Sequence, residues 1–242
     1  MNEVVIATFL AAFARAAAFM FSAPIIGGAM IPAKVRVGGS ASIALAVATV
    51  RPPVSAIDLP LVMPGEILMG LAAGFAIRLV FAGAESGGQL IGLHLGLGMA
   101  SFFDPSAGEQ AIVTRRFALI FASLAFLMMG GLREAVRVLA MAPADVSTLS
   151  GAVVQLMEQT NQVMVSALRF AAPAMIAGMV TNVGMAFASK AAPSLNIFSV
   201  MLSALLITGG FTLIVTAPAF IAEMSGTAQR AIDALHIVGG AR

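Results

Sequence analysis

Long apolar runs alternate along the whole chain with short breaks rich in proline, glycine and charged residues. The runs cover residues 4–31, 37–50, 61–82, 86–101, 117–132, 161–188 and 195–222. A helix that crosses the hydrocarbon core of a membrane needs about 20 predominantly apolar residues, and most of these runs meet or approach that length. The pattern therefore predicts an all-α membrane protein with about five to seven hydrophobic helices, and about six as the central expectation.

Prolines predict where these helices bend or break. Pro24 and the following Gly27-Gly28 pair interrupt the first run, because proline removes a helix donor and glycine relaxes the backbone. We therefore expect the first helix to bend or break near residue 24. Pro173 and Pro218 predict kinks in the last two runs for the same reason.

Three polar sections separate the runs. The segments 51–60 and 104–108 predict extended connections that face water or a partner, and 133–160 is the largest candidate for a water-facing part. Basic residues fall in successive connections, so the positive-inside rule gives no clear orientation. Without a polar linker, the chain is interpreted as one domain, residues 1–242.

Small residues repeat every four positions in the middle of the chain, at Ala84, Gly88, Gly92, Gly96 and Ala100. Residues at this spacing share one face of a helix, and a face without bulk allows another helix to approach closely. Glycine inside a helix costs about 1 kcal/mol relative to alanine, so close packing is expected in return. The stripe predicts an assembly surface for a neighbouring subunit.

Composition supports a membrane location and excludes several kinds of chemistry. Hydrophobic residues make up 60% of the 242 residues, charged residues make up 10%, and the mean hydropathy is +1.02. There is no Cys and only two His, which excludes disulfides and thiolate sites and predicts no metal or cofactor. The net charge of +2 and the scattered basic residues argue against a nucleic-acid partner.

Charged residues inside the apolar runs need an explanation, because an isolated charge there costs about 2.5–3.5 kcal/mol. Arg15, Glu66 and Arg78 are such residues. They could form a proton or ion relay, or they could be interhelical ion pairs and anchors in a larger assembly, and we favour the second interpretation. His94 could titrate near neutral pH, but a single His without a nearby acid is more typical of hydrogen-bonded structure. No motif of a hydrolase, zinc protease or phosphate-binding loop accompanies them, so no catalytic site is predicted.

A bulky cluster follows the glycine stripe. Met99, Phe102 and Phe103 stand where the stripe ends and the Asp104-Pro105 turn begins. Apolar groups held between closely packed helices can block ions and water by a dry constriction. The cluster therefore predicts a pore plug, and an ordinary buried loop is the alternative.

Four motifs, in order and spacing, resemble the FliR family of flagellar export-gate proteins, called SctT in injectisomes. They are Pro24-Ile25-Ile26-Gly27 with Ile31-Pro32 and Val35-Arg36; Glu66, Gly70 and Gly74; Gly88-Gln89-Leu90-Ile91 with Gly96, Ala100 and Asp104-Pro105; and Pro193-Ser194-Leu195-Asn196-Ile197-Phe198. The Pro-x-Lys that commonly follows the last motif is replaced by Leu202-Ser203-Ala204.

The resemblance implies a fusion of FliP-like and FliQ-like folds, with residues 1–190 as the FliP-like part and 191–242 as a C-terminal hairpin. It also implies FliP-like, FliQ-like and FlhB-like partners, and a plug near residues 99–110. Arg15, Arg36, Glu66 and Arg78 would then be assembly contacts, and Gly70, Gly74, Gly88, Gly92 and Gly96 would pack helices. Pro193, Asn196 and Phe198 belong to its C-terminal motif.

The predicted function is that of a non-enzymatic subunit of the flagellar type III export gate in the bacterial inner membrane, within the basal body. It would help to form and seal the channel for unfolded flagellar proteins. An injectisome export-gate subunit is the first alternative. A small-solute secondary transporter with a midplane site is the second, and an intramembrane enzyme is the least favoured.

The plug hypothesis predicts that deletion of residues 100–108 makes cells leak ions through assembled gates, because the dry constriction is lost. The measurement is membrane conductance in cells that express the variant. An unchanged conductance with intact gate assembly would contradict the sealing role.

Overall fold

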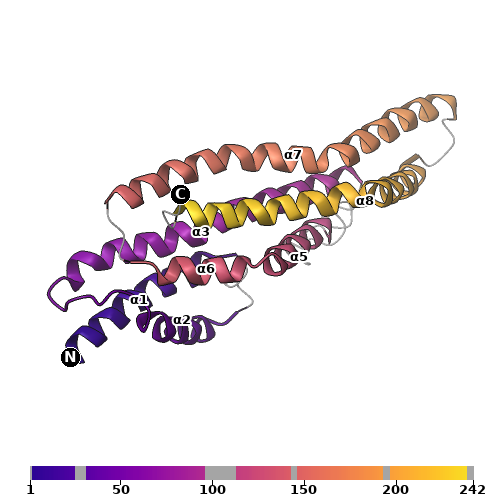
Figure 1. Cartoon of the computed structure of the whole chain (residues 1–242). Helices are drawn as coiled ribbons and strands as arrows, with labels where there is room; N and C mark the ends of the chain where they lie inside the picture. Colours follow the sequence, from indigo (N-terminus) through magenta and orange to yellow (C-terminus); the bar gives the residue numbers. More distant parts are fainter. Residues whose placement is uncertain (1, 25–30, 96–112, 143–145, 193–196, 239–242) are drawn as a thin grey trace. The chain divides into compact units, whose positions relative to one another are not determined.

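The computed structural model describes residues 2–24, 31–95, 113–142, 146–192 and 197–238, and these residues form helices and no strand. Figure 1 shows the seven helices that they contain. The helices are α1 (Asn2–Ser22), α2 (Ala33–Ala48), α3 (Leu59–His94), α5 (Val113–Met128), α6 (Gly131–Ala140), α7 (Val146–Ala191) and α8 (Ile197–Val238).

Four of the helices in the described part of the chain contain apolar stretches long enough to cross a membrane. The pair α5 and α6 adds a fifth candidate if it counts as one span, although its axis bends by 67°. The bend lies at Gly130, whose φ of +84° is a left-handed conformation that a residue without a Cβ adopts readily. The chain is therefore an all-α membrane protein, as the apolar runs predicted.

The helix boundaries follow the predicted breaks in part. α1 ends at Ser22, which confirms the break near residue 24, and residues 51–58 connect α2 to α3 without a helix. The runs at 61–82 and 86–101 were expected as separate elements, but α3 is one helix of 36 residues through Glu85. Glu85 does not interrupt it, because glutamate is a good helix former and its carboxylate meets the guanidinium of Arg115 at 3.0 Å. Pro173 and Pro218 lie inside the continuous helices α7 and α8.

The described residues form two compact units. The first contains Met1–Phe81, Ala125–Gln162 and Thr227–Arg242, and the second contains Ala82–Leu124 and Val163–Gly226. In the first unit, α1 and α2 pack together around Ala12, Ala44 and Val47, with Phe9 and Phe13 beside them. The small residues let the two helices approach, and the aromatic rings fill the edges of the contact.

Glycines allow close helix contacts within each unit. In the first unit, a Cβ added at Gly70 of α3 would clash with the carbonyl oxygen of Arg15 and lie 2.8 Å from the Cβ of Ala18, both on α1. In the second unit, a Cβ at Gly88 of α3 would lie 2.7 Å from the carbonyl oxygen of Thr114 on α5. These positions have no room for a side chain, so the helices meet at backbone distance.

The close crossing of α1 and α3 predicts that Gly70→Ala destabilises the protein. The added methyl group meets backbone atoms that cannot rotate away, and overpacking of this kind costs about 1–3 kcal/mol. A free-energy change of 1 kcal/mol moves Tm by about 2–4 °C in a domain of this size, so Tm should fall by several degrees. The chain has no Trp or Tyr, so unfolding in detergent is best followed by far-UV circular dichroism.

Gly184→Ala is the matched control, because the space around Gly184 on α7 is open. The same substitution there should leave Tm unchanged or raise it slightly, since alanine favours the helix by about 1 kcal/mol. Equal Tm changes for the two variants would contradict close packing at Gly70.

Candidate functional site

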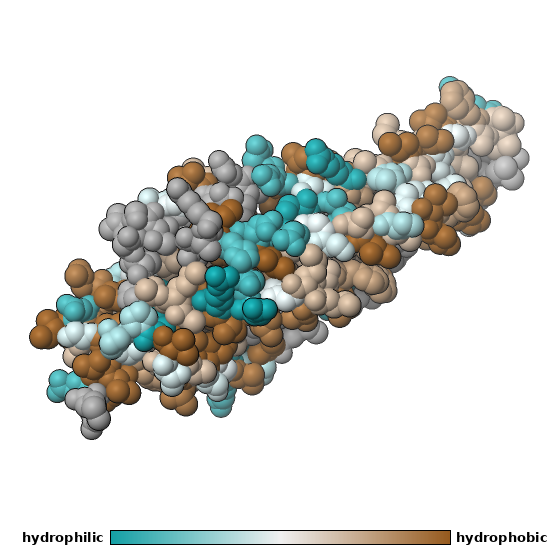
Figure 2. Space-filling model, in the orientation of Figure 1, coloured by the Kyte–Doolittle hydropathy of each residue, from teal (hydrophilic) through white to brown (hydrophobic). Residues whose placement is uncertain are grey.

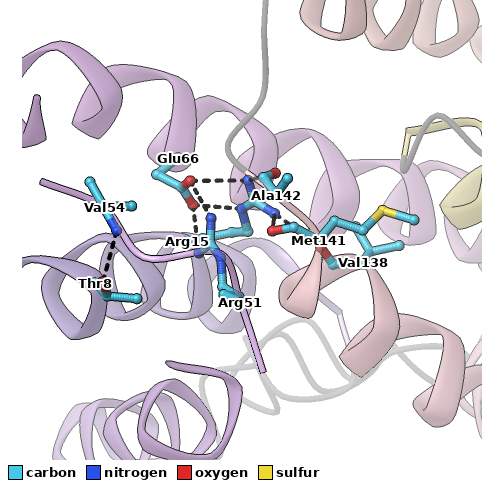
Figure 3. Close-up of polar contacts among 8 residues, drawn as sticks. All are labelled: Thr8, Arg15, Arg51, Val54, Glu66, Val138, Met141 and Ala142. Carbon is cyan, nitrogen blue, oxygen red and sulfur yellow. Dashed lines mark hydrogen bonds and ion pairs between the residues drawn. The ribbon is translucent and has the colours of Figure 1, made fainter. Parts of the chain in front are cut away.

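Three charged side chains meet in the interior of the first unit. Arg15 comes from α1, Glu66 comes from α3, and Arg51 comes from the connection that follows α2 (Figure 3). All three side chains are fully shielded from solvent. Because they stand far apart in the sequence, their contacts join three separate elements of the fold.

The Glu66 carboxylate lies between the two guanidinium groups, and each of its oxygens contacts both. Arg51 donates from Nη1 to Oε2 at 3.1 Å and from Nη2 to Oε1 at 2.5 Å, in the paired geometry that suits a carboxylate. Arg15 donates from Nη2 to Oε1 at 3.1 Å, and its Nε forms an ion pair with Oε2 at 2.7 Å. The carboxylate has no side that is open to water.

Arg15 also binds the end of α6. Its Nη1 donates to the carbonyl oxygens of Val138 at 3.1 Å and Met141 at 3.0 Å, and its Nη2 donates to that of Ala142 at 3.0 Å (Figure 3). The last carbonyls of a helix have no partners within the helix, and they carry the negative end of its dipole. The guanidinium therefore binds the carbonyl of Val138 in the last turn of α6, the carbonyls of the two residues that follow this helix, and the Glu66 carboxylate.

The spacing of small residues on α3 explains why Glu66 reaches Arg15. Glu66, Gly70 and Gly74 stand four residues apart and share one face of the helix. Gly70 lies against the backbone of Arg15, and a Cβ at Gly74 would lie 2.9 Å from the backbone nitrogen of Ala23, which directly follows α1. The two glycines bring α3 close to α1, so the carboxylate one turn away meets the guanidinium.

The chemistry of this cluster favours a structural role over proton transfer. Arginine does not lose its proton in proteins, and both oxygens of the Glu66 carboxylate are held by guanidinium groups. Two guanidinium groups surround one carboxylate, so the cluster holds a surplus positive charge that the α6 dipole compensates in part. The arrangement holds α1, α3, α6 and the connection after α2 together.

Arg51 is the member of the cluster that the sequence analysis did not assign. The segment 51–60 was expected to face water or a partner, and Pro52, Pro53 and residues 55–58 are exposed. Arg51 is buried, and so is Val54, whose backbone N–H donates to Thr8 Oγ1 at 2.9 Å. The signal in the sequence was weak, because an arginine between a helix and two prolines is usually solvated.

The other predicted charges lie elsewhere. Arg36 is half-buried, its guanidinium lies 4.7 Å from the ring centre of Phe21, and its Nε donates to the carbonyl oxygen of Ile31. Arg78 is exposed on α3, and no described residue forms an ion pair with it. His94 Nδ1 lies 2.9 Å from the carbonyl oxygen of Leu90 in its own helix, which fits hydrogen-bonded structure.

At Gly88, the glycine stripe packs against another helix of this same chain. We expected a neighbouring subunit at Gly88, but α5 of the same chain occupies this face through Thr114 and Ala118. The hydroxyl of Thr114 also donates to the carbonyl oxygen of Gly88 at 2.7 Å. Gly92 is buried on α3.

Several predicted residues lie outside the described residues. They are Gly96, the plug residues Met99, Phe102, Phe103, Asp104 and Pro105, and the motif residues Pro193 and Asn196. Phe198 falls in the first turn of α8. Their proposed roles stay sequence-based predictions.

The described part of the chain contains no group of three or more His, Asp or Glu side chains that could hold a metal ion. The buried ion cluster is the candidate site of the first unit, and it is formed by Arg15, Arg51 and Glu66.

The buried cluster predicts that Glu66→Gln strongly destabilises the fold, because two buried guanidinium groups would then face a neutral amide. Removal of one partner from a buried ion pair costs about 3–5 kcal/mol. The variant should show a large loss of monodisperse protein in gel filtration and a lower Tm in detergent.

Arg78→Gln is the control, since Arg78 lies on the same helix but is exposed. It should keep the gel-filtration profile and Tm of the wild-type chain. A Glu66→Gln variant with wild-type Tm would show that the buried charges do not hold the fold.

Comparison with known proteins identifies the relatives of this chain. A FliR flagellar biosynthetic protein of Pectobacterium carotovorum is 30% identical over 86% of this chain and 83% of its own length. The FliR protein of Escherichia coli is 28% identical over 76% of this chain and 74% of its own length. The Yop proteins translocation protein T of Yersinia pestis is 31% identical over 60% of this chain and 58% of its own length.

The model of the family "Bacterial export proteins, family 1" matches residues 6–231. This range includes all the charged residues of the buried cluster and all the described helices except the first turn of α1 and the last turns of α8. With its all-α membrane fold and its FliR relatives, this chain belongs to family 1 of the bacterial export proteins.

Proposed function

We propose that this protein is a core subunit of the type III export gate of the bacterial flagellum. The observation that carries the proposal is the family match over most of the chain, together with relatives named as flagellar biosynthetic proteins. The gate would pass unfolded flagellar proteins across the inner membrane, within the basal body. The chain contributes helices to the channel and performs no catalysis, with energy supplied by other parts of the apparatus.

The exposed apolar surface of the second unit supports assembly with other membrane subunits. Only 11% of the most apolar stretch of α8 and 22% of that of α7 is buried within the chain. Large side chains on α8 are exposed, among them Ile207, Phe211 and Ile214. Figure 2 shows apolar side chains over much of the visible face. FliP-like and FliQ-like subunits would cover part of this surface and lipid would cover the rest, with an FlhB-like protein as a further partner.

The buried ion cluster would serve the gate by keeping the first unit rigid. Arg15 joins α1 to the end of α6, and Glu66 joins both to α3. A subunit that packs against several neighbours needs a fixed arrangement of its own helices, and a cluster that joins four segments meets that need. The seal itself is assigned to residues 99–105, on the sequence argument above.

An injectisome export gate is the second candidate, favoured by the likeness to the Yop proteins translocation protein T. The flagellar candidate is preferred, because the similarity to the flagellar proteins extends over more of the chain.

Co-expression tests the proposal. The chain, produced together with FliP-like and FliQ-like proteins of the same organism, should form a detergent-stable complex that survives affinity purification and gel filtration. Deletion of its gene should abolish flagellar assembly while cells remain viable. A chain that purifies alone from this co-expression, as a monomer or homodimer, would argue against the gate.

A further inference from the structure

The short helix α6 of the first unit carries two kinds of side chain on its outer surface. Leu132 and Val136 are exposed and stand four residues apart, and Arg133 and Arg137 are exposed at the same spacing. With 3.6 residues per turn, each pair forms one line along the helix, and the arginine line lies about 100° round from the apolar line. The outer surface of α6 therefore has an apolar edge beside a basic edge.

The inner face of α6 is held by the chain itself. Its buried residues are Gly131, Ala135, Val138 and Leu139. Arg15 binds carbonyls in its last turn and just after it (Figure 3). Oε2 of Glu134 lies 3.7 Å from Nε2 of His236 in α8. These contacts fix which side of α6 faces outward.

Both arginines of the basic edge are accessible to an anion. No hydrogen bond or ion pair joins Arg133 to another described residue. The side chain of Arg137 is 58% exposed, and its Nη1 lies 3.6 Å from Oε2 of Glu134. This separation is too long for a hydrogen bond, and an exposed ion pair of this kind is weak. The two guanidinium groups therefore keep donors that phosphate oxygens can accept.

The chain places these two edges at the boundary of an apolar helix. α5 is apolar from Phe117 to Met128, and α6 leaves it at an angle of 67°. Met128 and Met129 are exposed at the bend, so exposed apolar side chains extend from the end of α5 into α6. An exposed arginine within the hydrocarbon core is costly, which places the basic edge outside that core. α6 thus lies where acyl chains meet headgroups.

We propose that α6 is an interfacial helix that binds the headgroups of anionic phospholipids. Leu132 and Val136 lie against the acyl chains, and Arg133 and Arg137 hold phosphate groups beside them. Lipid is favoured over an acidic protein surface, because the apolar edge continues from the apolar helix α5 and an interfacial helix gains from both kinds of contact. The inference does not depend on the proposed export function, since it rests on the membrane fold and the outer surface of α6.

Tryptophan fluorescence tests the proposal, because the chain has no Trp. The full-length Leu132→Trp variant is placed in vesicles of phosphatidylglycerol and phosphatidylcholine in equal amounts, with one lipid or the other brominated near the glycerol end of its acyl chains. Bromine quenches a tryptophan that it contacts, so quenching reports which lipid lies beside α6. Phosphatidylglycerol should be preferred about fivefold, the effect of roughly one arginine at an anionic surface. Equal quenching by the two lipids, or no quenching, would overturn the proposal.

The arginines are tested in the same assay. Arg133→Gln combined with Arg137→Gln should remove the preference for phosphatidylglycerol, while quenching itself persists at the apolar edge. Arg116→Gln is the matched control, because Arg116 is exposed in the first turn of α5, at the opposite end of that helix from α6. It should keep the preference. A double variant that still prefers phosphatidylglycerol about fivefold would refute headgroup binding by this edge.

Two further reporters separate a local effect from a general one. Val136→Trp replaces Leu132→Trp if the latter folds poorly, since both positions lie on the apolar edge. Ile207→Trp is the control, because Ile207 is exposed on α8 and no charged residue stands within two helical turns of it in the sequence. Both lipids should quench this reporter equally. The same preference for phosphatidylglycerol at Ile207 would contradict a specific role of α6.

A protein partner on this surface is the alternative occupant. The chain is placed in the same vesicles together with its FliP-like and FliQ-like partners, and the fluorescence of the complex with the wild-type chain is subtracted. Lipid at α6 predicts that the tryptophan of Leu132→Trp is still quenched in the complex. Loss of quenching on assembly would replace the lipid by a protein surface.

Discussion

The burial of Glu66 is the constraint on which the first unit depends. A carboxylate removed from water is unstable unless cations and hydrogen-bond donors surround it, and here two guanidinium groups do so. Each arginine comes from a different element, and Arg15 also binds carbonyls in the last turn of α6 and just after it. Movement of α1, α3 or the connection after α2 would separate these buried charges in an apolar interior. The cluster thus links four segments, three of them through the carboxylate and α6 through Arg15.

Close helix packing makes this charge contact possible and recurs in the second unit. Gly70 and Gly74 bring α3 against α1, which places Glu66 beside Arg15. In the second unit Gly87 lies against α7, where a Cβ would come within 3.0 Å of the carbonyl oxygen of Ala167, and Gly88 lies against α5. The long helix α3 therefore relies on glycines, which have no side chain, at its close contacts with α1, α5 and α7. The faces of α7 and α8 that remain exposed would be covered by lipid or by other subunits of the proposed export gate.

Sequence patterns predicted the elements better than their contacts. The apolar runs predicted the all-α membrane fold, and the prolines and glycines near residue 24 predicted the end of α1. The runs 61–82 and 86–101 form one helix, α3, because glutamate favours a helix and the partner of Glu85, Arg115, is found only across a contact between helices. Arg51 was missed for a similar reason, since nothing next to it in the sequence shows that Glu66 is its partner.

The sequence by itself determined that the chain is apolar, helical and free of cysteine chemistry. These properties follow from the length of the apolar runs and from the types of side chain, and neither depends on contacts between distant residues. It also singled out Arg15 and Glu66 as charges that need partners. Only the tertiary structure decided which partners they have, and that α5 of the same chain covers Gly88. These outcomes depend on which helix faces meet, and residues brought together across 51 positions of chain leave no periodic signal in the sequence.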